Sequence, residues 1–494
     1  MLGRVNRFLA TTVVIFASAV VLVLEVTATR LVAPYAGDTL ETYTAAIGVA
    51  LGAIAVGAKL GGDAADRWRP DRLLGPLLVL GGGLTMLSRP IVLVVGPSLV
   101  GTGPFAALLL VALGIALPVA LLSAVTPVVV KTQLADLHHT GGIVGRFSAW
   151  GTVGALAGTF LTGYVFIAAL PVSAILLLTG SALIAFGAFL LLRHALSSLS
   201  RQAMAVLGLT VVSSGLLLGV ASPCDAETAY YCARVTTDPA NPSGRVLLLD
   251  DLRHGYVDVA DPTHLEFAYT QWFAAAIAAR AGEAPVSTLH IGGGAYTMPR
   301  WLAATRPGST SHVFEVDPAV TELARSRLQL RTGPRLSVSS GDARIAITTA
   351  ETDRYDVVIG DAFGGLSVPW HLTTREFLAE IERVLKPGGI YVANIIDYGP
   401  RSFLQAEVAT VGVVFDTLSV IGHRASDSAV RGGNHVIVAT DGALARGELR
   451  RAVATAPTPG HLTAQQQVAR WQRQGQVLTD DYAPVDQLLT PYLT

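Results

Sequence analysis

Long apolar runs in residues 1–221 constrain the fold of this chain more than any other feature. A helix needs about 20 consecutive apolar residues to cross a hydrocarbon core about 30 Å thick, and the sequence contains about seven such runs. They lie at Phe8–Leu31, Thr42–Leu60, Leu73–Val95, Pro104–Val130, Ile143–Ala169, Val172–Leu192 and Ala203–Ala221. The sequence therefore predicts a multi-pass α-helical membrane domain over residues 1–221, with the lipid bilayer as its partner.

The distribution of charge separates this part from the rest. Residues 1–221 hold 12 basic and 7 acidic side chains, whereas residues 222–494 hold 23 basic and 29 acidic ones. The formal net charge of -1 therefore combines a basic first part with an acidic second part. Because the chain lacks the basic excess of a nucleic-acid-binding protein, we expect no nucleic-acid partner. The sequence leaves the oligomeric state open.

Basic residues between the apolar runs predict the orientation in the cell membrane, because cytoplasmic loops retain Lys and Arg. They concentrate before the first run and after the second, fourth and sixth runs, so we expect a cytoplasmic N-terminus. These residues are Arg4, Arg7, Lys59, Arg67, Arg69, Arg72, Lys131, Arg146, Arg193 and Arg201, against Arg30 and Arg89 on the opposite side. With seven spans, everything after Ala221 would lie outside the cell.

Two ionisable residues fall in the first apolar run or close to its end, namely Glu25 and Arg30. An ionisable group at such depth is costly unless it is paired or lines a polar cavity. Glu25 and Arg30 are therefore candidates for a polar membrane site. The alternatives are a salt bridge between helices or, for Arg30, a side chain that reaches the membrane surface.

The chain has two cysteines, Cys224 and Cys232, just beyond the last apolar run. A short disulfide-closed loop would fit an oxidising compartment, and two buried thiols are the alternative.

For the second part of the chain, the sequence predicts a linker with a small β unit over 222–285, followed by an α/β domain over 286–494. Short apolar runs there alternate with helical stretches, as in an open sheet with crossover helices. The expected strands are Ser287–Ile291, His312–Val316, Leu336–Val338, Tyr355–Ile359, Ile390–Ile396, Thr417–Ile421 and His435–Ala439. The expected helices are Ala319–Arg331, Thr374–Leu385 and Leu404–Val414, and the small β unit comprises Gly244–Asp250 and Gly255–Val259.

Candidate site residues follow the ends of successive predicted strands. The glycines Gly292, Gly293 and Gly294 end the first strand, where the backbone can approach a ligand closely. Glu315 ends the second strand, Asp342 follows the third, and Asp361 stands at the end of the fourth. Three carboxylates beside a glycine turn favour an adenosyl ligand that carries positive charge over a pyrophosphate, and we expect no metal.

Together these segments resemble membrane-fused spermidine synthase-like proteins, which join a major-facilitator-like helical half to a polyamine aminopropyltransferase-like domain. In the first half the resemblance rests on Leu24-Glu25, Arg30, Ala33-Pro34-Tyr35-Ala36-Gly37 and the loop at Asp66-Arg67. In the second half it rests on Leu249-Asp250, the three glycines, Glu315-Val316-Asp317-Pro318, Gly341-Asp342-Ala343, Tyr355-Asp356-Val357-Val358, Asp361 and Leu385-Lys386-Pro387-Gly388-Gly389.

The resemblance implies a class I methyltransferase-like, Rossmann-like fold preceded by a small β domain. It implies that decarboxylated S-adenosylmethionine, or S-adenosylmethionine itself, donates an aminopropyl or methyl group to an amine. Glu315 would hold the ribose and Asp342 the adenine, and Asp361 would act as the catalytic residue that orients or deprotonates the amine. His254 and His264 could line the same cleft and bind substrate.

Two departures from the family pattern keep a second hypothesis open. Ala295 follows the glycines where the family has Asp, and Gly364 stands where the family has a second Asp after the position of Asp361. The alternative is a non-catalytic transport or sensing protein that binds a polyamine or nucleoside. The implied chemistry favours a cytosolic domain, whereas the loop charges favour the exterior, so the side of this domain stays open.

Overall fold

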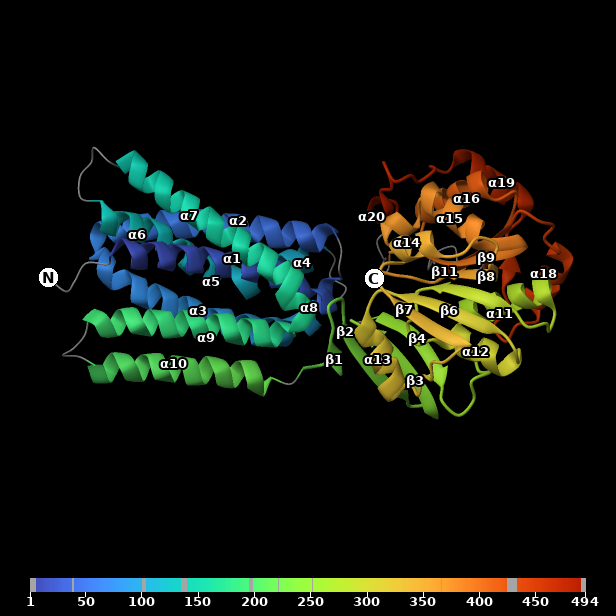
Figure 1. The fold of residues 1–494 in the computed structure, drawn as a ribbon, viewed down its shortest axis with the longest axis horizontal. Helices are drawn as coiled ribbons and strands as arrows, with labels where there is room; N and C mark the ends of the chain where they lie inside the picture. Colours follow the sequence, from blue (N-terminus) through green and yellow to red (C-terminus); the bar gives the residue numbers. More distant parts are fainter. Residues whose placement is uncertain are drawn as a thin grey trace. The chain divides into compact units, whose positions relative to one another are not determined.

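The computed structural model of the chain describes residues 6–37, 40–99, 104–134, 140–194, 199–220, 222–250, 252–365, 367–423 and 433–489. The chain forms two compact units, Met1–Cys232 and Ala233–Thr494. The boundary falls inside the segment 222–285 that the sequence assigns to a linker and a small β unit. Each unit is drawn in Figure 1 and is described by itself below.

The first unit is helical. Its helices are α1 (Arg7–Ala36), α2 (Leu40–Arg67), α3 (Pro70–Val95), α4 (Pro104–Val111), α5 (Leu117–Ser123), α6 (Val125–Gln133), α7 (Thr140–Leu161), α8 (Ile167–Ala169), α9 (Val172–His194) and α10 (Leu199–Gly219). Single π-helical turns join α4 to α5 and α7 to α8, so each of these pairs runs on without a loop.

Six helices in the described part of the chain are long and apolar enough to cross a membrane. They match the first six predicted runs: Arg7–Ala36, Leu40–Arg67, Pro70–Ser98, Phe105–Gln133, Thr140–Ala169 and Val172–Leu192. The seventh run coincides with α10, which is 21 residues long. The described apolar part of α10 is the shorter stretch Gly208–Gly219. A seventh span therefore stays a prediction.

Glycines allow the long helices to approach each other closely. A Cβ atom on Gly154 or Gly158 of α7 would lie 2.2 Å from the carbonyl oxygen of Ile15 or Ala19 in α1. Small residues at helix contacts are typical of membrane bundles, where lipid provides no hydrophobic drive for association. Large apolar side chains such as Leu51 and Phe160 instead lie exposed on the outside of the unit.

The second unit begins with a small antiparallel sheet. It contains β2 (Cys232–Asp238), β3 (Asn241–Leu249) and β4 (Leu252–Asp258), each paired with the next. β3 and β4 are the two strands of the predicted β unit, and β2 was not predicted. The pairing of β3 with β4 shifts register at His254, which becomes the extra residue of a bulge between Arg253 and Gly255.

The main sheet of the second unit has eight strands in the order β12-β10-β11-β9-β8-β5-β6-β7. β7, β6, β5, β8 and β9 run parallel, and β11, β10 and β12 extend the sheet with antiparallel pairs. The strands are β5 (Ser287–Ile291), β6 (Thr310–Glu315), β7 (Leu336–Ser340), β8 (Tyr355–Gly360), β9 (Leu385–Asp397), β10 (Thr417–Gly422), β11 (Gly433–Thr440) and β12 (His461–Leu462).

Helices cover both faces of this sheet, and an apolar core lies under each layer. α15, α16 and α19 pack on one face, and α11, α12 and α18 pack on the other (Figure 1). The helices are α11 (Ala268–Ala281), α12 (Thr297–Thr305), α13 (Pro318–Arg327), α14 (Ala343–Ala346), α15 (Arg375–Val384), α16 (Ser402–Val414), α18 (Arg446–Ala454), α19 (Gln465–Gln474) and α20 (Val485–Leu488). The sheet order reverses at β5, which is where open α/β sheets bind ligands.

Candidate active site

The glycine turn after β5 lies at this reversal point. Gly292 has φ +96° and Gly294 has φ +50°, conformations that favour glycine. A Cβ atom on Gly292 would lie 2.5 Å from the carbonyl oxygen of Asp361. The turn therefore packs directly against the backbone at the end of β8, and side chains are excluded there.

Glu315, the last residue of β6, holds the glycine turn in place. Its Oε2 accepts hydrogen bonds from the backbone N–H groups of Gly293 (2.8 Å) and Gly294 (3.3 Å), and its Oε1 accepts one from Asp317 (2.9 Å). The side chain is only 6% exposed. Burial raises the pKa of Glu315, and the three backbone donors oppose that rise. Glu315 thus joins two strand ends, a structural role that the sequence did not reveal.

Asp361 follows β8 and lies half-buried between two side chains from other elements. Tyr269 of α11 donates its hydroxyl to Oδ2 at 3.1 Å, and Asn394 of β9 donates its amide to Oδ1 at 3.0 Å. Burial raises the pKa of Asp361 to about 6, although both hydrogen bonds favour the ionised form. A carboxylate with such a pKa can exchange protons near neutral pH.

The hydrogen-bonded chain extends from Asp361 to a third strand. Asn434 of β11 donates its side-chain amide to Oδ1 of Asn394 at 2.9 Å. This contact fixes which end of the Asn394 amide faces the carboxylate. Sequence reasoning missed Tyr269, Asn394 and Asn434. The one available signal was Asn394, a polar residue inside the apolar strand Ile390–Ile396.

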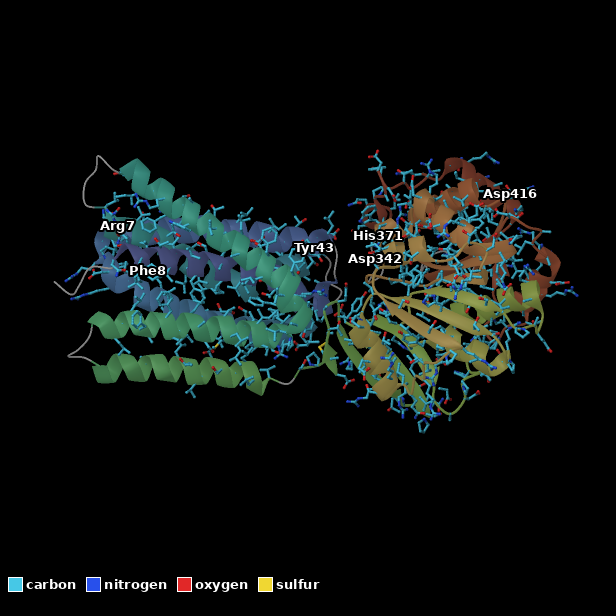
Figure 2. The ribbon with its side chains drawn as sticks, in the orientation of Figure 1. Arg7, Phe8, Tyr43, Asp342, His371 and Asp416 are labelled. Carbon is cyan, nitrogen blue, oxygen red and sulfur yellow. A yellow bond between two sulfur atoms is a disulfide. The ribbon has the colours of Figure 1, made fainter. Side chains whose placement is uncertain are left out.

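Asp342 follows β7 and begins α14, where its Oδ1 accepts the backbone N–H of Arg344 at 2.8 Å. Its Oδ2 lies 3.2 Å from Nε2 of His371, in the short 3-10 turn Trp370–Leu372. Figure 2 labels Asp342 and His371, which lie beside each other. The sequence identified Asp342 but not His371.

The two histidine candidates have different surroundings. His254 lies on the bulge of β4, and its carbonyl oxygen would be 3.7 Å from a Cβ atom on Gly294. Burial lowers the pKa of His254 to about 4, so its imidazole is neutral at pH 7. His264 is exposed, with its Nε2 at 3.1 Å from Glu266 and its ring against Tyr256. The expectation that both line one cleft stays a prediction.

The residue after the glycine turn is enclosed by the small sheet. Ala295 is buried, and a Cβ atom on Gly255 of β4 would lie 2.5 Å from its side chain. Tyr296 is fully buried and shares a 2.7 Å hydrogen bond with Thr321. β4 thus covers the turn where the sequence has Ala295 in place of an acidic residue.

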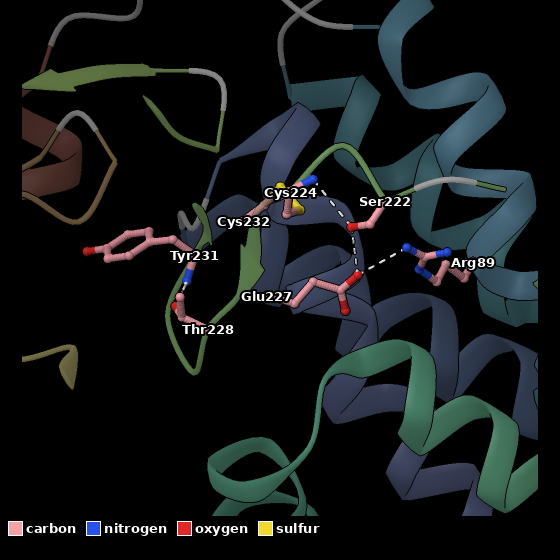
Figure 3. Close-up of a disulfide and its surroundings, with 7 residues drawn as sticks. All are labelled: Arg89, Ser222, Cys224, Glu227, Thr228, Tyr231 and Cys232. Atoms are coloured by element: carbon pink, nitrogen blue, oxygen red, sulfur yellow. Dashed lines mark hydrogen bonds and ion pairs between the residues drawn. A yellow bond between two sulfur atoms is a disulfide. The ribbon is translucent and has the colours of Figure 1, made fainter. Parts of the chain in front are cut away.

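The membrane and cysteine candidates lie in the first unit. Cys224 and Cys232 form a disulfide with their Cα atoms 5.2 Å apart (Figure 3). Within the loop that it closes, Glu227 forms a 3.0 Å ion pair with Arg89. Arg30 lies 5.6 Å from the centre of the Tyr230 ring.

Arg30 and Arg89 fall near the ends of the predicted runs Phe8–Leu31 and Leu73–Val95, and the structure places them within α1 and α3. Arg89 is 5% exposed, and it also donates to the carbonyl oxygen of Val220 at 3.2 Å, just beyond the end of α10. The buried guanidinium thus has a structural explanation, namely capping a helix end and pairing with Glu227. Glu25 lies half-buried in α1. In the part of the chain that is described, no three His, Cys, Asp or Glu residues could hold a metal ion together.

The fold and the strand-end carboxylates define a class I methyltransferase-like domain. Residues 289–393 match the methyltransferase-domain family. The polyamine aminopropyltransferase of Vibrio vulnificus is 30% identical over 216 residues, 41% of this chain and 70% of the relative. Polyamine aminopropyltransferase 2 of Streptomyces coelicolor is 27% identical over 425 residues, 81% of this chain and 76% of the relative. A probable spermidine synthase structure from Corynebacterium glutamicum covers 52% of this chain and 95% of its own, at TM-score 0.48 and 25% identity.

The chain belongs to the polyamine aminopropyltransferase family and is a spermidine synthase-like transferase. The Streptomyces alignment of 425 residues is longer than the second unit, which runs from Ala233 to Thr494. It therefore extends well into the helical unit, so this relative is similar to both parts of the chain.

Proposed function

We propose that the chain is a membrane-anchored transferase that moves an aminopropyl group, or a methyl group, from an adenosyl sulfonium compound to an amine. The donor would be decarboxylated S-adenosylmethionine or S-adenosylmethionine. The observation that carries the proposal is the setting of Asp361, a carboxylate with a raised pKa between Tyr269 and Asn394, beside the glycine turn.

The residues at the strand ends suit such a donor. Gly292 lets the turn pack against the end of β8, and the bare backbone of Gly294 leaves room for a ligand. The nearby carboxylates suit a positive charge better than a phosphate. Glu315 would fix the turn and use its one remaining lone pair, on Oε1, for a ribose hydroxyl, and Asp342 would accept from adenine. When bound, such a donor supplies an electrophilic carbon attached to a sulfonium sulfur.

Asp361 would act on the acceptor amine. An amine attacks only through a free lone pair, so it must lose a proton before or during the reaction. Asp361 would hold the nitrogen in line and accept that proton. Tyr269 and Asn394 would keep the carboxylate oriented, because each binds a different oxygen.

The helical unit would anchor the transferase in the cell membrane with its N-terminus in the cytoplasm. Six long apolar helices, the glycine-lined contacts and the basic residues between the helices support this proposal. The disulfide between Cys224 and Cys232 supports an oxidising surrounding for the segment after α10, and hence an exterior location. Lipid and a small amine are the proposed partners.

The test uses the full chain purified in detergent or nanodiscs. Calorimetry with S-adenosylmethionine, its decarboxylated form and putrescine measures binding, and mass spectrometry of the products separates aminopropyl from methyl transfer. Asp361→Asn should retain donor binding and lose turnover about 100-fold or more, the usual contribution of a general base. If neither adenosyl compound binds, the proposal is wrong. If one binds without any turnover, the chain is instead a sensing or transport protein.

A further inference from the structure

The Asp342 carboxylate is fixed by two donors from different parts of the second unit. Its Oδ1 accepts from the backbone of Arg344 in α14, and its Oδ2 faces Nε2 of His371. Because an ionised carboxylate can only accept hydrogen bonds, the imidazole is the donor. The turn Trp370–Leu372, which follows Asp361 in the chain, is thereby tied to the end of β7. Both side chains stay partly exposed, at 37% for Asp342 and 31% for His371.

Exposed apolar surface gathers around this pair. Among the described residues of the second unit, only four large apolar side chains are exposed, namely Ile345, Trp370, Val413 and Tyr482. Trp370 is 50% exposed and Ile345 is 71% exposed. Trp370 adjoins His371, and Ile345 is three residues beyond Asp342. The indole and imidazole rings meet edge-on, with centroids 5.7 Å apart and planes at 84°, so His371 supports the edge of Trp370.

This combination fits one kind of chemical group. A half-exposed indole offers a face on which a flat ring can stack. Each oxygen of Asp342 has a lone pair left after its present contact. A lone pair can only accept a hydrogen bond, so a ligand group that faces it must carry a donor. A purine with an exocyclic amino group meets both requirements, whereas a purine with an oxygen in that place would turn an acceptor toward the carboxylate.

We propose that Trp370 and His371 bind the nucleobase together with Asp342. Trp370 stacks on the base, and His371 is a positioning residue that holds the Asp342 carboxylate for the amino group. The inference rests on the proposed adenosyl ligand and goes beyond it by assigning base recognition to the turn after Asp361. It also predicts selection of a 6-amino over a 6-oxo purine.

Binding can be measured without turnover, using the full chain and 5′-methylthioadenosine or its inosine counterpart as probes. The unmodified chain should bind the adenosine compound at least about tenfold more tightly than the inosine compound. Trp370→Ala should weaken adenosine binding about tenfold, the expected loss for a base stacked on an aromatic ring. Trp370→Phe should retain most of it. Trp68→Ala is the matched control, because Trp68 is 62% exposed but belongs to the first unit.

His371 is tested by selectivity. His371→Ala should reduce the preference for adenosine over inosine several-fold, and His371→Gln, which keeps a side-chain donor, should restore part of it. Fluorescence gives a second readout among the six tryptophans of the chain. Ligand quenching should disappear in Trp370→Phe and persist in Trp68→Phe.

The two proposals fail in different ways. If the unmodified chain binds the adenosine compound but Trp370→Ala and His371→Ala leave affinity and selectivity unchanged, the base-recognition proposal is overturned and the transferase proposal stands. If the unmodified chain binds no adenosyl compound, both are overturned.

Discussion

A carboxylate acts as a base only while it is ionised, and the surroundings of Asp361 set the pH at which this happens. Burial raises its pKa from 3.8 to about 6. Because the native state holds this proton more tightly than the unfolded chain does, protonation of Asp361 contributes to stability at low pH. That contribution is lost as the pH rises through about 6. The free energy of unfolding is therefore lower at neutral pH, where Asp361 is ionised, than it would be with a carboxyl of ordinary pKa.

The acid side of the pH–rate profile should report this ionisation. We expect turnover to fall as the pH drops below about 6 and to level off above it. Asn394→Ala removes a donor that favours the ionised form, so it should shift this limb upward by about one pH unit. Thr440→Ser, on β11 with its hydroxyl bonded to Gly389, is a control that should leave the limb in place. A profile that is flat between pH 5 and 7 would contradict the role of Asp361.

Whether a residue of the candidate site could be predicted depends on how far away in the sequence its hydrogen-bond partners lie. The placing of Glu315, Asp342 and Asp361 at one edge of the sheet could be predicted because each lies at or just beyond the end of an apolar strand, and parallel strands end at the same edge. Their roles stay predictions. Tyr269 comes from a helix 92 residues before Asp361, and Asn434 from a strand 40 residues after Asn394. No local pattern reports such distances, so these partners required the three-dimensional structure.

At the scale of elements, the turn after β5 joins two strand ends and tolerates little change. Gly292→Ala would place a Cβ atom 2.5 Å from the Asp361 carbonyl oxygen at φ +96°. We expect it to lower the free energy of unfolding of the second unit by about 2 kcal/mol or more, and to reduce adenosyl binding.

Gly364→Ala provides the control for this change. Its Cβ atom would meet nothing within 4 Å, so stability should change by less than about 0.5 kcal/mol. Denaturant unfolding followed by the near-ultraviolet signal compares the two variants. Equal stabilities would show that the turn can relax away from Asp361.

The contact between α1 and α7 depends on glycine in a similar way. Gly158→Ala would put a methyl group 2.2 Å from the Ala19 carbonyl oxygen and force the helices apart, at a cost of about 1–3 kcal/mol. Gly145→Ala lies on the same helix with open space around it, so it should be neutral or slightly stabilising. Thermal unfolding in detergent should rank the two accordingly, and the reverse ranking would be inconsistent with this packing.

The elements themselves were largely predictable because their patterns are strong. All seven predicted strands are present, and β5 has the predicted bounds Ser287–Ile291. α11 was missed because its apolar residues, around Trp272 and Phe273, are buried nearly all round instead of on one stripe. β9 runs from Leu385, through Pro387, Gly388 and Gly389, residues that normally indicate a turn.

At the scale of the whole molecule, the side of the membrane is open to a direct test. With Cys224 and Cys232 outside the cell and bonded, a membrane-impermeant maleimide should label intact cells only after treatment with an impermeant reductant. Cys224→Ser leaves Cys232 as a single thiol and should be labelled without reduction. Labelling that always requires permeabilised cells would place this segment, and the unit after it, in the cytoplasm.

The net charge of the chain reflects its division into two units of opposite charge. The near-zero total conceals a helical unit with basic segments between apolar helices and an acidic α/β unit whose carboxylates line the proposed site. Composition predicted the division into two kinds of domain. It could not predict that Arg89 is paired with Glu227, because that contact joins residues 138 positions apart.

The place of Asn434 in the chain has a consequence for biosynthesis. β11 inserts between β9 and β10, and only then does the Asn394 amide gain the neighbour that orients it toward Asp361. A ribosome must therefore release residues beyond Thr440 before this carboxylate has its full surroundings. The proposed base Asp361 therefore lacks its complete surroundings until β11 has left the ribosome, and we expect any activity to appear only after that point.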